Sequence, residues 1–466
     1  MPDFADTIFA LATSSPPRSG SGIAIVRLSG PDSWKAASTL TGLKKFLPRQ
    51  FTLSDFSYNG QPIDHSGLIY FPKPNSYTGE DIVEFHLHGG MSIIKSMFSV
   101  LIDLGLRPAE PGEFTRRAFL NGKMDLTQAE AVARIVSSSG ESATREGVRQ
   151  RAGSLRAAIN SIRNDLRRLL GNLEVVFDYP EEVEDSVEEP QIISALNSIL
   201  EKLNKLLASH KTGKLLSGIR LAIIGKPNVG KSSLLNAILN EDRAIVTETP
   251  GTTRDVVSGS MLIDGFPFEL LDTAGIRKKS DTTDSIELQG IERSWREVEK
   301  AHVVLIVLDY SSPVDQYDID LIQEAIERTR DSGAEIIFVR NKNDLPEVSL
   351  PNDFPPNSVQ AGKSMLDLSA KSGDNIGSLV GEISSRLDLS SHQDEIIITE
   401  SRQNALIGET VSIIENIADG IKKNEVPQDI AATELWGADR TLGRILGDGI
   451  SSADLDEIFS HFCIGK

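Results

Sequence analysis

The octapeptide at residues 225–232 (GKPNVGKS) constrains the fold of this chain more than any other stretch. It follows the apolar run Ile219–Ile224, which we expect to be a buried strand, and precedes Lys231–Leu239, whose apolar residues recur at helical spacing. A glycine-rich turn between a strand and a helix lets backbone N–H groups surround phosphate oxygens, while Lys231 can reach the β- and γ-phosphates and Ser232 can bind Mg²⁺. The sequence therefore predicts a phosphate-binding loop within a βα nucleotide-binding domain.

Length and composition indicate a globular protein of several domains. At 466 residues the chain is too long for one core, and its 39% hydrophobic and 25% charged residues are typical of globular domains. Its apolar runs are far shorter than a membrane span, so we expect no membrane association. The N-terminus lacks the basic segment of a secretory signal, and a single cysteine, Cys463, fits a reducing compartment. We therefore expect a cytoplasmic protein.

Charge is unevenly distributed along the chain. The net charge of −19 argues against nucleic-acid binding over the whole surface. Residues 116–168 are nevertheless basic, with 11 Lys or Arg against 5 Asp or Glu. Solvated helix faces are the simpler explanation for such a run, which leaves it only a candidate surface for RNA.

Changes of pattern along the chain predict the domain organisation. Short apolar segments separated by turn residues predict an α+β domain over residues 1–120. Residues 121–215 and 388–466 have helical periodicity, whereas residues 216–387 alternate strand and helix. The fold class is thus multidomain, α/β plus α, with the nucleotide-binding domain inserted into a helical domain formed by two chain segments.

A polar strand face in the N-terminal domain is a candidate binding surface. Strand alternation over residues 81–88 places Glu84, His86 and His88 on one face and apolar residues on the other. Two histidines at this spacing can bind a metal, but with no third ligand nearby a solvated or ligand-facing pair is favoured.

Four further motifs follow the phosphate-binding loop in the order found in GTPases. Residues 272–275 (DTAG) follow a strand and place a carboxylate near Mg²⁺ and an N–H near the γ-phosphate. Residues 341–344 (NKND) follow another strand, and the Asp344 carboxylate can accept hydrogen bonds from guanine N1–H and its amino group. Residues 369–371 (SAK) complete the base site, and residues 249–255 (TPGTTRD) contain a threonine for Mg²⁺. The base we expect is guanine.

This set resembles the P-loop GTPases related to Era, which have a Ras-like G domain. The residue after the DTAG motif is Ile276, where Ras-type proteins have a glutamine. An apolar side chain cannot orient the attacking water, so another residue must do so, and Asp281, Asp284 and Glu287 are the candidates that the sequence leaves open. No arginine finger can be assigned, so some other positive charge has to stabilise the transition state.

Over its whole length the sequence resembles the MnmE (TrmE) family of tRNA modification GTPases. Besides the GTPase motifs, the resemblance rests on these stretches: residues 12–17 (ATSSPP), 20–30 (GSGIAIVRLSG), 76–90 (SYTGEDIVEFHLHGG), 111–132 (PGEFTRRAFLNGKMDLTQAEAV) and 463–466 (CIGK). It implies a GTPase that acts with the FAD protein MnmG to add an aminomethyl-type or carboxymethylaminomethyl group to C5 of wobble uridine 34 in certain tRNAs.

The resemblance also implies roles for residues of the G domain. It assigns a K⁺ ion to the arginine-finger position, with Asn228, Thr247, Thr249 and Thr252 as ligands, and Mg²⁺ to Ser232 and Thr253. Glu287 corresponds to the glutamate that positions water and Lys231 to the catalytic lysine. The GTP-binding residues that we expect are Asn228, Val229, Gly230, Lys231, Ser232, Ser233, Thr247, Glu248, Thr249, Pro250, Gly251, Thr252, Thr253, Asp272, Thr273, Ala274, Gly275, Asn341, Lys342, Asp344, Ser369, Ala370 and Lys371.

Outside the G domain, the resemblance implies a folate site and a dimer. The N-terminal domain is similar to folate-binding folds, and the family match points to Arg27, Glu84, Lys123 and Lys466 around 5-formyl- or 5,10-methylene-tetrahydrofolate. Family members dimerise through this domain, so we expect a homodimer, and a complex of two plus two chains with MnmG.

Two questions remain open at the level of sequence. Cys463 can be a catalytic thiol near the folate or a small residue that anchors the tail, and a prenylation motif fits poorly. The alternative to a modification enzyme is a GTP-dependent RNA-binding switch, such as a ribosome-assembly factor. A simple switch needs neither the folate-type domain nor the cysteine tail.

Overall fold

The computed structural model describes residues 6–14, 20–138, 140–178, 189–240, 245–246, 257–271, 285–351, 354, 365–389 and 395–465. The chain divides into two compact units. One unit consists of Met1–Val136, Gly147–Leu203 and Ala405–Lys466, and the other of Ser137–Glu146 and Asn204–Asn404. Both units are therefore built from separated chain segments, and the second includes Ser137–Glu146 besides a continuous stretch. The exact limits at residues 120, 215 and 387 stay predictions.

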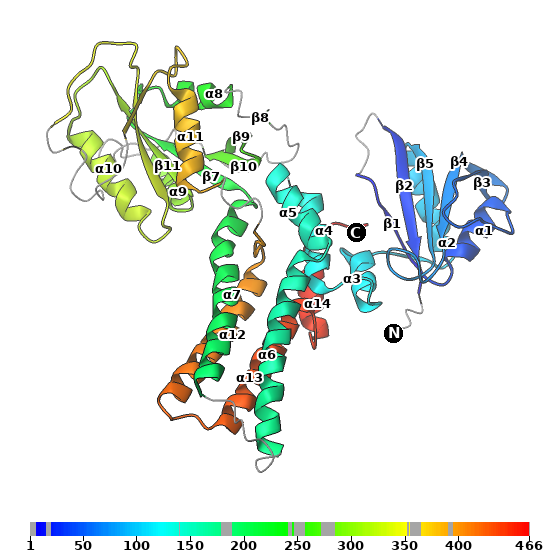
Figure 1. Ribbon diagram of the computed structural model, residues 1–466. Helices are drawn as coiled ribbons and strands as arrows, with labels where there is room; N and C mark the ends of the chain where they lie inside the picture. Colours follow the sequence, from blue (N-terminus) through cyan, green and yellow to red (C-terminus); the bar gives the residue numbers. More distant parts are fainter. Residues whose placement is uncertain are drawn as a thin grey trace. The chain divides into compact units, whose positions relative to one another are not determined.

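The first unit begins with a six-stranded sheet in the order β3-β4-β5-β2-β1-β6. Its strands are β1 (Ile8–Leu11), β2 (Ser21–Ser29), β3 (Thr52–Tyr58), β4 (Gln61–Phe71), β5 (Ile82–Gly89) and β6 (Arg107–Pro108). Helices α1 (Ser33–Thr41) and α2 (Met91–Asp103) pack on one face and contribute Leu40 and Leu101 to the core (Figure 1). An α+β fold was predicted for this region, and the structure has it.

Alternation along two neighbouring strands creates the second, polar face of this sheet. In β5, Val83 and Phe85 are fully buried in the core, whereas Glu84 between them is only partly buried. In the antiparallel partner β2, Arg27 lies directly opposite Glu84. Because side chains alternate between faces, both project away from the helix-covered side. The predicted polar face is therefore present, with a cation next to its carboxylate.

Helices complete the first unit. They are α3 (Glu113–Leu120), α4 (Leu126–Ser137), α5 (Glu141–Arg151), α6 (Ser154–Asp178), α7 (Glu189–Leu215), α12 (Ser401–Lys422), α13 (Gln428–Leu446) and α14 (Ser452–Ser460), of which α4, α5, α7 and α12 extend into the second unit's segments. The region of residues 388–466, for which the sequence predicts helices, contains α12, α13 and α14. Gly447, which has φ +101°, ends α13, and a Cβ there would lie 2.6 Å from the Phe119 ring.

Much of the basic run at residues 116–168 is used within the unit. Arg163 is buried and pairs with Asp439 at 3.0 Å and with Asp448 at 2.8 Å. Arg117 is 1% exposed and pairs with Asp6, Glu80 and Glu113; these arginines bind the unit's own carboxylates rather than forming a free basic surface. The expectation of solvated helix faces is therefore wrong for Arg117 and Arg163, which are buried in ion pairs.

The second unit contains a seven-stranded sheet in the order β13-β12-β11-β7-β10-β9-β8. Its strands are β7 (Ile219–Ile224), β8 (Ile245–Val246), β9 (Val257–Ile263), β10 (Phe266–Leu271), β11 (Val303–Asp309), β12 (Glu335–Asn341) and β13 (Met365–Leu368). The pairs among β7, β10, β11, β12 and β13 are parallel, whereas β9 pairs antiparallel with β10 and β8.

Helices cover both faces of this sheet (Figure 1). Leu305 of β11 faces the core formed with α8 (Lys231–Leu239) and α11 (Ile376–Arg386). The next residue, Ile306, faces the core formed with α9 (Ser285–Glu299) and α10 (Gln316–Arg328). Burial on both faces explains why β11 reads as a continuous apolar run. The parallel strands end at one edge, where ligands of such sheets bind.

No helix in the part of the chain that the structure describes is both long enough and apolar enough to span a membrane.

Candidate nucleotide and anion sites

The phosphate-binding loop lies between β7 and α8, as the sequence predicts. Asn228 at its apex is exposed and has φ +66°, a left-handed conformation that asparagine tolerates better than most residues. Lys231 Nζ donates to the carbonyl oxygens of Gly225 at 2.8 Å and Lys226 at 2.7 Å. Its ammonium therefore lies over the loop, where phosphate oxygens would bind. Ser232 and Ser233 are exposed in the first turn of α8.

Two glycines of this loop are required by their neighbours. A Cβ on Gly225 would lie 2.4 Å from the Val307 carbonyl oxygen of β11. A Cβ on Gly230, which has φ +95°, would lie 2.2 Å from the Asn341 side-chain nitrogen. Both distances are shorter than any tolerable contact, so the loop can approach the adjacent strands only without these side chains.

Asn341 joins the phosphate-binding loop to the base-recognition loop. Its Nδ2 donates to the Val229 carbonyl oxygen at 2.8 Å, and its Oδ1 accepts the Ala370 N–H at 2.9 Å. The residue is 2% exposed, so both hydrogen bonds are made away from water. One buried amide thus connects three predicted motifs that lie far apart in the sequence.

The other base-site residues are also assembled at the ends of β12 and β13. Ser369 Oγ donates to Asp344 Oδ1 at 2.7 Å, which orients the carboxylate expected to read guanine. Lys342 Nζ binds Asp309 Oδ2 at 2.6 Å. Burial alone would raise the pKa of Asp309, but hydrogen bonds from Lys342 and Ser311 outweigh burial and keep that pKa below its usual value. Lys371 is exposed beside this group.

The sequence did not predict the ion pairs between Lys226 and the start of α10. Lys226 Nζ lies 2.6 Å from carboxylate oxygens of both Asp315 and Asp318. Burial alone would lower the pKa of Lys226, but the hydrogen bonds to these carboxylates raise it. Asp315 and Asp318 also form the capping box of α10, which marks the start of this helix but gives no signal of the contact with Lys226.

Several predicted GTPase residues lie outside the described part of the chain. These are Thr247, Glu248, Thr249, Pro250, Gly251, Thr252, Thr253, Asp272, Thr273, Ala274 and Gly275, together with the alternative water-positioning residues Asp281 and Asp284. Glu287 lies in α9, but its side chain is not among the described ones. Their roles stay predictions.

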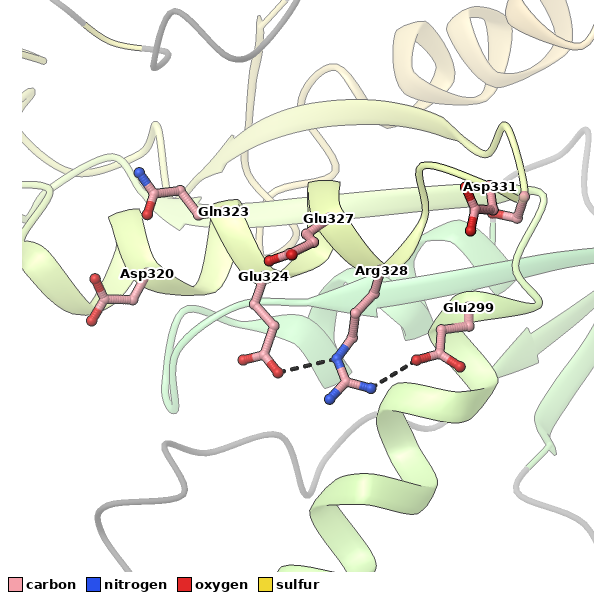
Figure 2. Close-up of a pocket in the computed structure, with 8 residues that line it drawn as sticks. Glu299, Asp320, Gln323, Glu324, Glu327, Arg328 and Asp331 are labelled. Atoms are coloured by element: carbon pink, nitrogen blue, oxygen red, sulfur yellow. Dashed lines mark hydrogen bonds and ion pairs between the residues drawn. The ribbon is translucent and has the colours of Figure 1, made fainter.

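A hollow of about 900 Å³ beside α10 has the wrong charge for a nucleotide. Figure 2 shows the carboxylates of Glu299, Asp320, Glu324 and Glu327 around it, with Arg328 as its cation. Arg328 is already paired with Glu299 at 2.7 Å and with Glu324 at 3.1 Å. The remaining carboxylates would repel phosphate, so this hollow is a poorer candidate for a nucleotide site than the loop between β7 and α8.

The N-terminal sheet bears a second candidate site, a cavity of about 510 Å³ on its polar face. Its charged lining residues are Arg27, Arg49, Glu84 and Lys123, and Phe71 and Tyr77 provide aromatic surface. The volume is within the range of small-molecule sites. Three of the four residues predicted for folate, Arg27, Glu84 and Lys123, are therefore brought together.

Glu84 is held as a carboxylate in this cavity. Arg27 Nε donates to Glu84 Oε1 at 2.8 Å, and His86 Nε2 lies 3.8 Å from Glu84 Oε2, an electrostatic contact too long for a hydrogen bond. Burial alone would raise the pKa of Glu84, but the interactions with His86 and Arg27 outweigh burial and lower it. Glu84 can therefore accept hydrogen bonds from amide-type N–H groups of a ligand.

Among the described residues, His88 and Cys463 were also singled out in the sequence but do not line the cavity. His88 is directed to Asp64, with Nδ1 to Oδ1 at 2.7 Å. Cys463 is exposed and has a free thiol. Its backbone carbonyl oxygen accepts the Gly112 N–H at 3.4 Å. Lys466 lies outside the described residues. Within the described residues, no group of three His, Cys, Asp or Glu side chains could bind a metal ion.

Comparison with known families gives two matches that together cover nearly the whole chain. The model described as MnmE helical domain matches residues 126–463, and the model described as GTP-binding protein TrmE N-terminus matches residues 7–123. Relatives named tRNA modification GTPase MnmE from Thermotoga maritima and Aquifex aeolicus are 41% and 37% identical to this chain. Each alignment spans 464 residues and covers 99% of this chain and 100% of the relative.

Among solved structures, Era from Aquifex aeolicus bound to GDP and AlF4⁻ is similar to part of the chain. It has 26% identity and a TM-score of 0.26, covering 42% of this chain and 66% of that one. The G domain of the Thermotoga maritima iron transporter FeoB has 22% identity and a TM-score of 0.24, covering 36% of this chain and 98% of that one.

Proposed function

The chain belongs to the MnmE family of tRNA modification GTPases, and from that premise we propose that it hydrolyses GTP in a K⁺-stimulated reaction that supports modification of wobble uridine in tRNA. The observation that carries the GTPase part is the pair of hydrogen bonds by which Asn341 joins the phosphate-binding loop to the base-recognition loop. These bonds hold the two loops together, and in the proposed site Lys231 would bind phosphate and Asp344 would read guanine.

Asn228 is the residue of the described part that we propose as a K⁺ ligand, with Thr247, Thr249 and Thr252 completing the set. An exposed amide oxygen at the loop apex suits a weakly hydrated monovalent cation, and a cation there would stabilise charge on the β- and γ-phosphates. Ser232 and Thr253 would bind Mg²⁺. Glu287 would position the attacking water, because Ile276 cannot.

The K⁺ requirement is tested by GTP turnover in KCl and NaCl at equal ionic strength. We expect faster hydrolysis in KCl, and equal rates would overturn the assignment. The matched variant is Asn228→Gly, because glycine adopts φ +66° without strain and removes only the side-chain amide. It should bind GDP as the wild type does and lose the difference between the two salts.

The cavity on the N-terminal sheet is our proposed site for 5-formyl- or 5,10-methylene-tetrahydrofolate. Glu84 can accept hydrogen bonds from the amide-rich pterin, and Arg27 and Lys123 are the cations that an acidic folate needs. Titration of 5-formyl-tetrahydrofolate into the full chain should saturate, and Glu84→Gln should weaken binding. A wild-type chain that does not bind the ligand would reject this site.

Modification at C5 of uridine 34 requires redox chemistry, which in this proposal the flavoprotein MnmG provides. We propose a homodimer of this chain in a complex of two plus two chains with MnmG, acting in the cytoplasm. The deciding experiment is mass analysis of wobble uridine in tRNA from cells with and without the protein. Unchanged uridine would favour the RNA-binding switch instead.

Cys463 is the remaining proposed catalytic residue, because an exposed thiol can act as a nucleophile toward a uridine carbon or a one-carbon unit. A Cys463→Ser protein that retains full modification activity with MnmG would refute this role.

A further inference from the structure

The cavity on the N-terminal sheet carries more positive charge than its own residues neutralise. Arg27 is compensated by Glu84, which lies 2.8 Å away. Lys123 Nζ donates to the Pro74 carbonyl oxygen at 2.8 Å, and an Arg49 Nη donates to the carbonyl oxygen of Asn75. Carbonyl groups bear only partial charge. The cations of Lys123 and Arg49 therefore have hydrogen-bond acceptors here, but neither of these acceptors is a counter-ion.

Arg49 is held at the edge of this cavity by its backbone. Its N–H donates to the Tyr70 carbonyl oxygen at 2.8 Å, beside the bridge between Pro48 and Tyr70. The residue has φ +59°, an uncommon conformation for a long side chain. Its guanidinium carbon lies 5.7 Å from the centre of the Phe71 ring, within cation–π range. The guanidinium is thus positioned in advance, although the residue as a whole is exposed.

A guanidinium in such a place is suited to one kind of ligand group. Its planar set of N–H donors matches the two oxygens of a carboxylate, and hydrogen bonds to a charged acceptor are stronger than those to a carbonyl. Folates carry carboxylates on the glutamate end and none on the pterin. An anionic ligand end would therefore replace the Asn75 carbonyl as the partner of Arg49.

We propose that Arg49 is a specificity-determining residue of this cavity, where its guanidinium binds a carboxylate of the ligand's glutamate end and so selects acidic folates over uncharged pterins. The inference rests on the proposed folate function. It adds a residue that neither the sequence motifs nor the family match assigned.

The test compares two ligands of equal size on the full-length chain. One is 5-formyl-tetrahydrofolate, and the other is its diamide, in which both carboxylates are carboxamides. The wild type should bind the acid about tenfold or more tightly than the diamide, the size expected of one charge-assisted hydrogen-bonded pair. Arg49→Gln should lose most of this preference because its affinity for the acid falls. Its affinity for the diamide should stay within about threefold of the wild-type value.

Two variants serve as controls. Lys44→Gln removes the same charge from an exposed residue of the same connecting segment that does not line the cavity, and it should retain the wild-type preference. Arg49→Lys keeps the charge but lacks the planar set of donors, so it should retain part of the preference for the acid.

The outcomes separate the two proposals. If the wild type binds neither ligand, the folate function fails and this inference with it. If the wild type binds folate but Arg49→Gln keeps the full preference for the acid, or weakens both ligands equally, the role of Arg49 is refuted while the folate function stands.

Discussion

Asn341 Nδ2 lies 2.8 Å from the Val229 carbonyl oxygen, so the loop that reads the base also fixes the loop that binds phosphate. Replacing Asn341 by alanine removes this bond and the one to the Ala370 N–H, and leaves both partners unsatisfied near a buried position. Each loss costs about 1–3 kcal/mol. We expect Asn341→Ala to weaken the binding of GTP and GDP by at least about tenfold in equilibrium titrations.

Asn343 provides the control for this prediction. It lies two residues away in the same motif, and its side chain pairs with Asp374 at an exposed position. Asn343→Ala should change nucleotide affinity by less than about threefold, because exposed pairs contribute little. Equal losses in the two variants would contradict the role of Asn341 as the connecting residue.

Gly230→Ala should disrupt the phosphate-binding loop. The added Cβ would lie 2.2 Å from Asn341 Nδ2 and would impose φ +95° on a residue with a side chain. We expect loss of GTP binding and a destabilisation of about 1–3 kcal/mol, measured by urea unfolding. Gly381→Ala, in α11 of the same unit, has nothing within 4 Å of the new Cβ and should instead stabilise by about 0.5–1 kcal/mol.

Arg117 is expected to be critical for the stability of the first unit. Its side chain is 1% exposed and pairs with Asp6 at 2.8 Å and Glu80 at 3.2 Å. Arg117→Met leaves these carboxylates without their buried partner, which costs about 3–5 kcal/mol. Arg168→Met is the comparison, because Arg168 is 75% exposed and lies 3.7 Å from Asp165. Its thermal unfolding should be nearly unchanged, and similar losses in both would show that burial is not decisive.

His302 should make the second unit sensitive to mild acid. Burial and the nearby Arg220 lower the pKa of His302 below its usual 6.5, and its Nδ1 accepts the Arg220 N–H at 2.9 Å. Because the unfolded chain takes up a proton first, the stabilisation is fully present above about pH 6.5 and is lost as the pH falls through 6.5 toward the folded pKa.

The measurement is the free energy of unfolding in urea at pH 7.5 and 5.5. His302→Asn, which retains an acceptor but does not titrate, should show a smaller difference between the two pH values than the wild type. His65→Asn, at an exposed histidine in the other unit, is the control and should alter that difference less than His302→Asn does. An unaltered pH dependence in His302→Asn would reject the assignment.

The phosphate-binding loop could be predicted from sequence because its causes are local. The strand Ile219–Ile224 and the helix Lys231–Leu239 have the predicted bounds, since apolar spacing and two glycines within one short segment specify them. The alternation within β5 that places Glu84 on one face of the sheet and the apolar side chains on the other is equally local.

The connections between segments could not be predicted in this way. The tie from Lys226 to Asp315 and the hydrogen bond from Asn341 to Val229 depend on which strands become neighbours. Arg49 was also missed, because its position depends on the pairing of Pro48 with Tyr70 rather than on a motif. The spacing of residues in the sequence does not indicate which distant segments come into contact.

The packing of Gly465 against β1 has a consequence for how the protein is made. Gly465 has φ +93°, and a Cβ there would lie 2.3 Å from the Leu11 carbonyl oxygen, while Phe459 and Phe462 pack with Ala118 and Met124. The N-terminal sheet is thus synthesised long before the residues that complete its surroundings. During translation Ala118 and Met124 are likewise made long before Phe459 and Phe462, which pack against them, so their apolar side chains stay uncovered until residues 459–465 have left the ribosome.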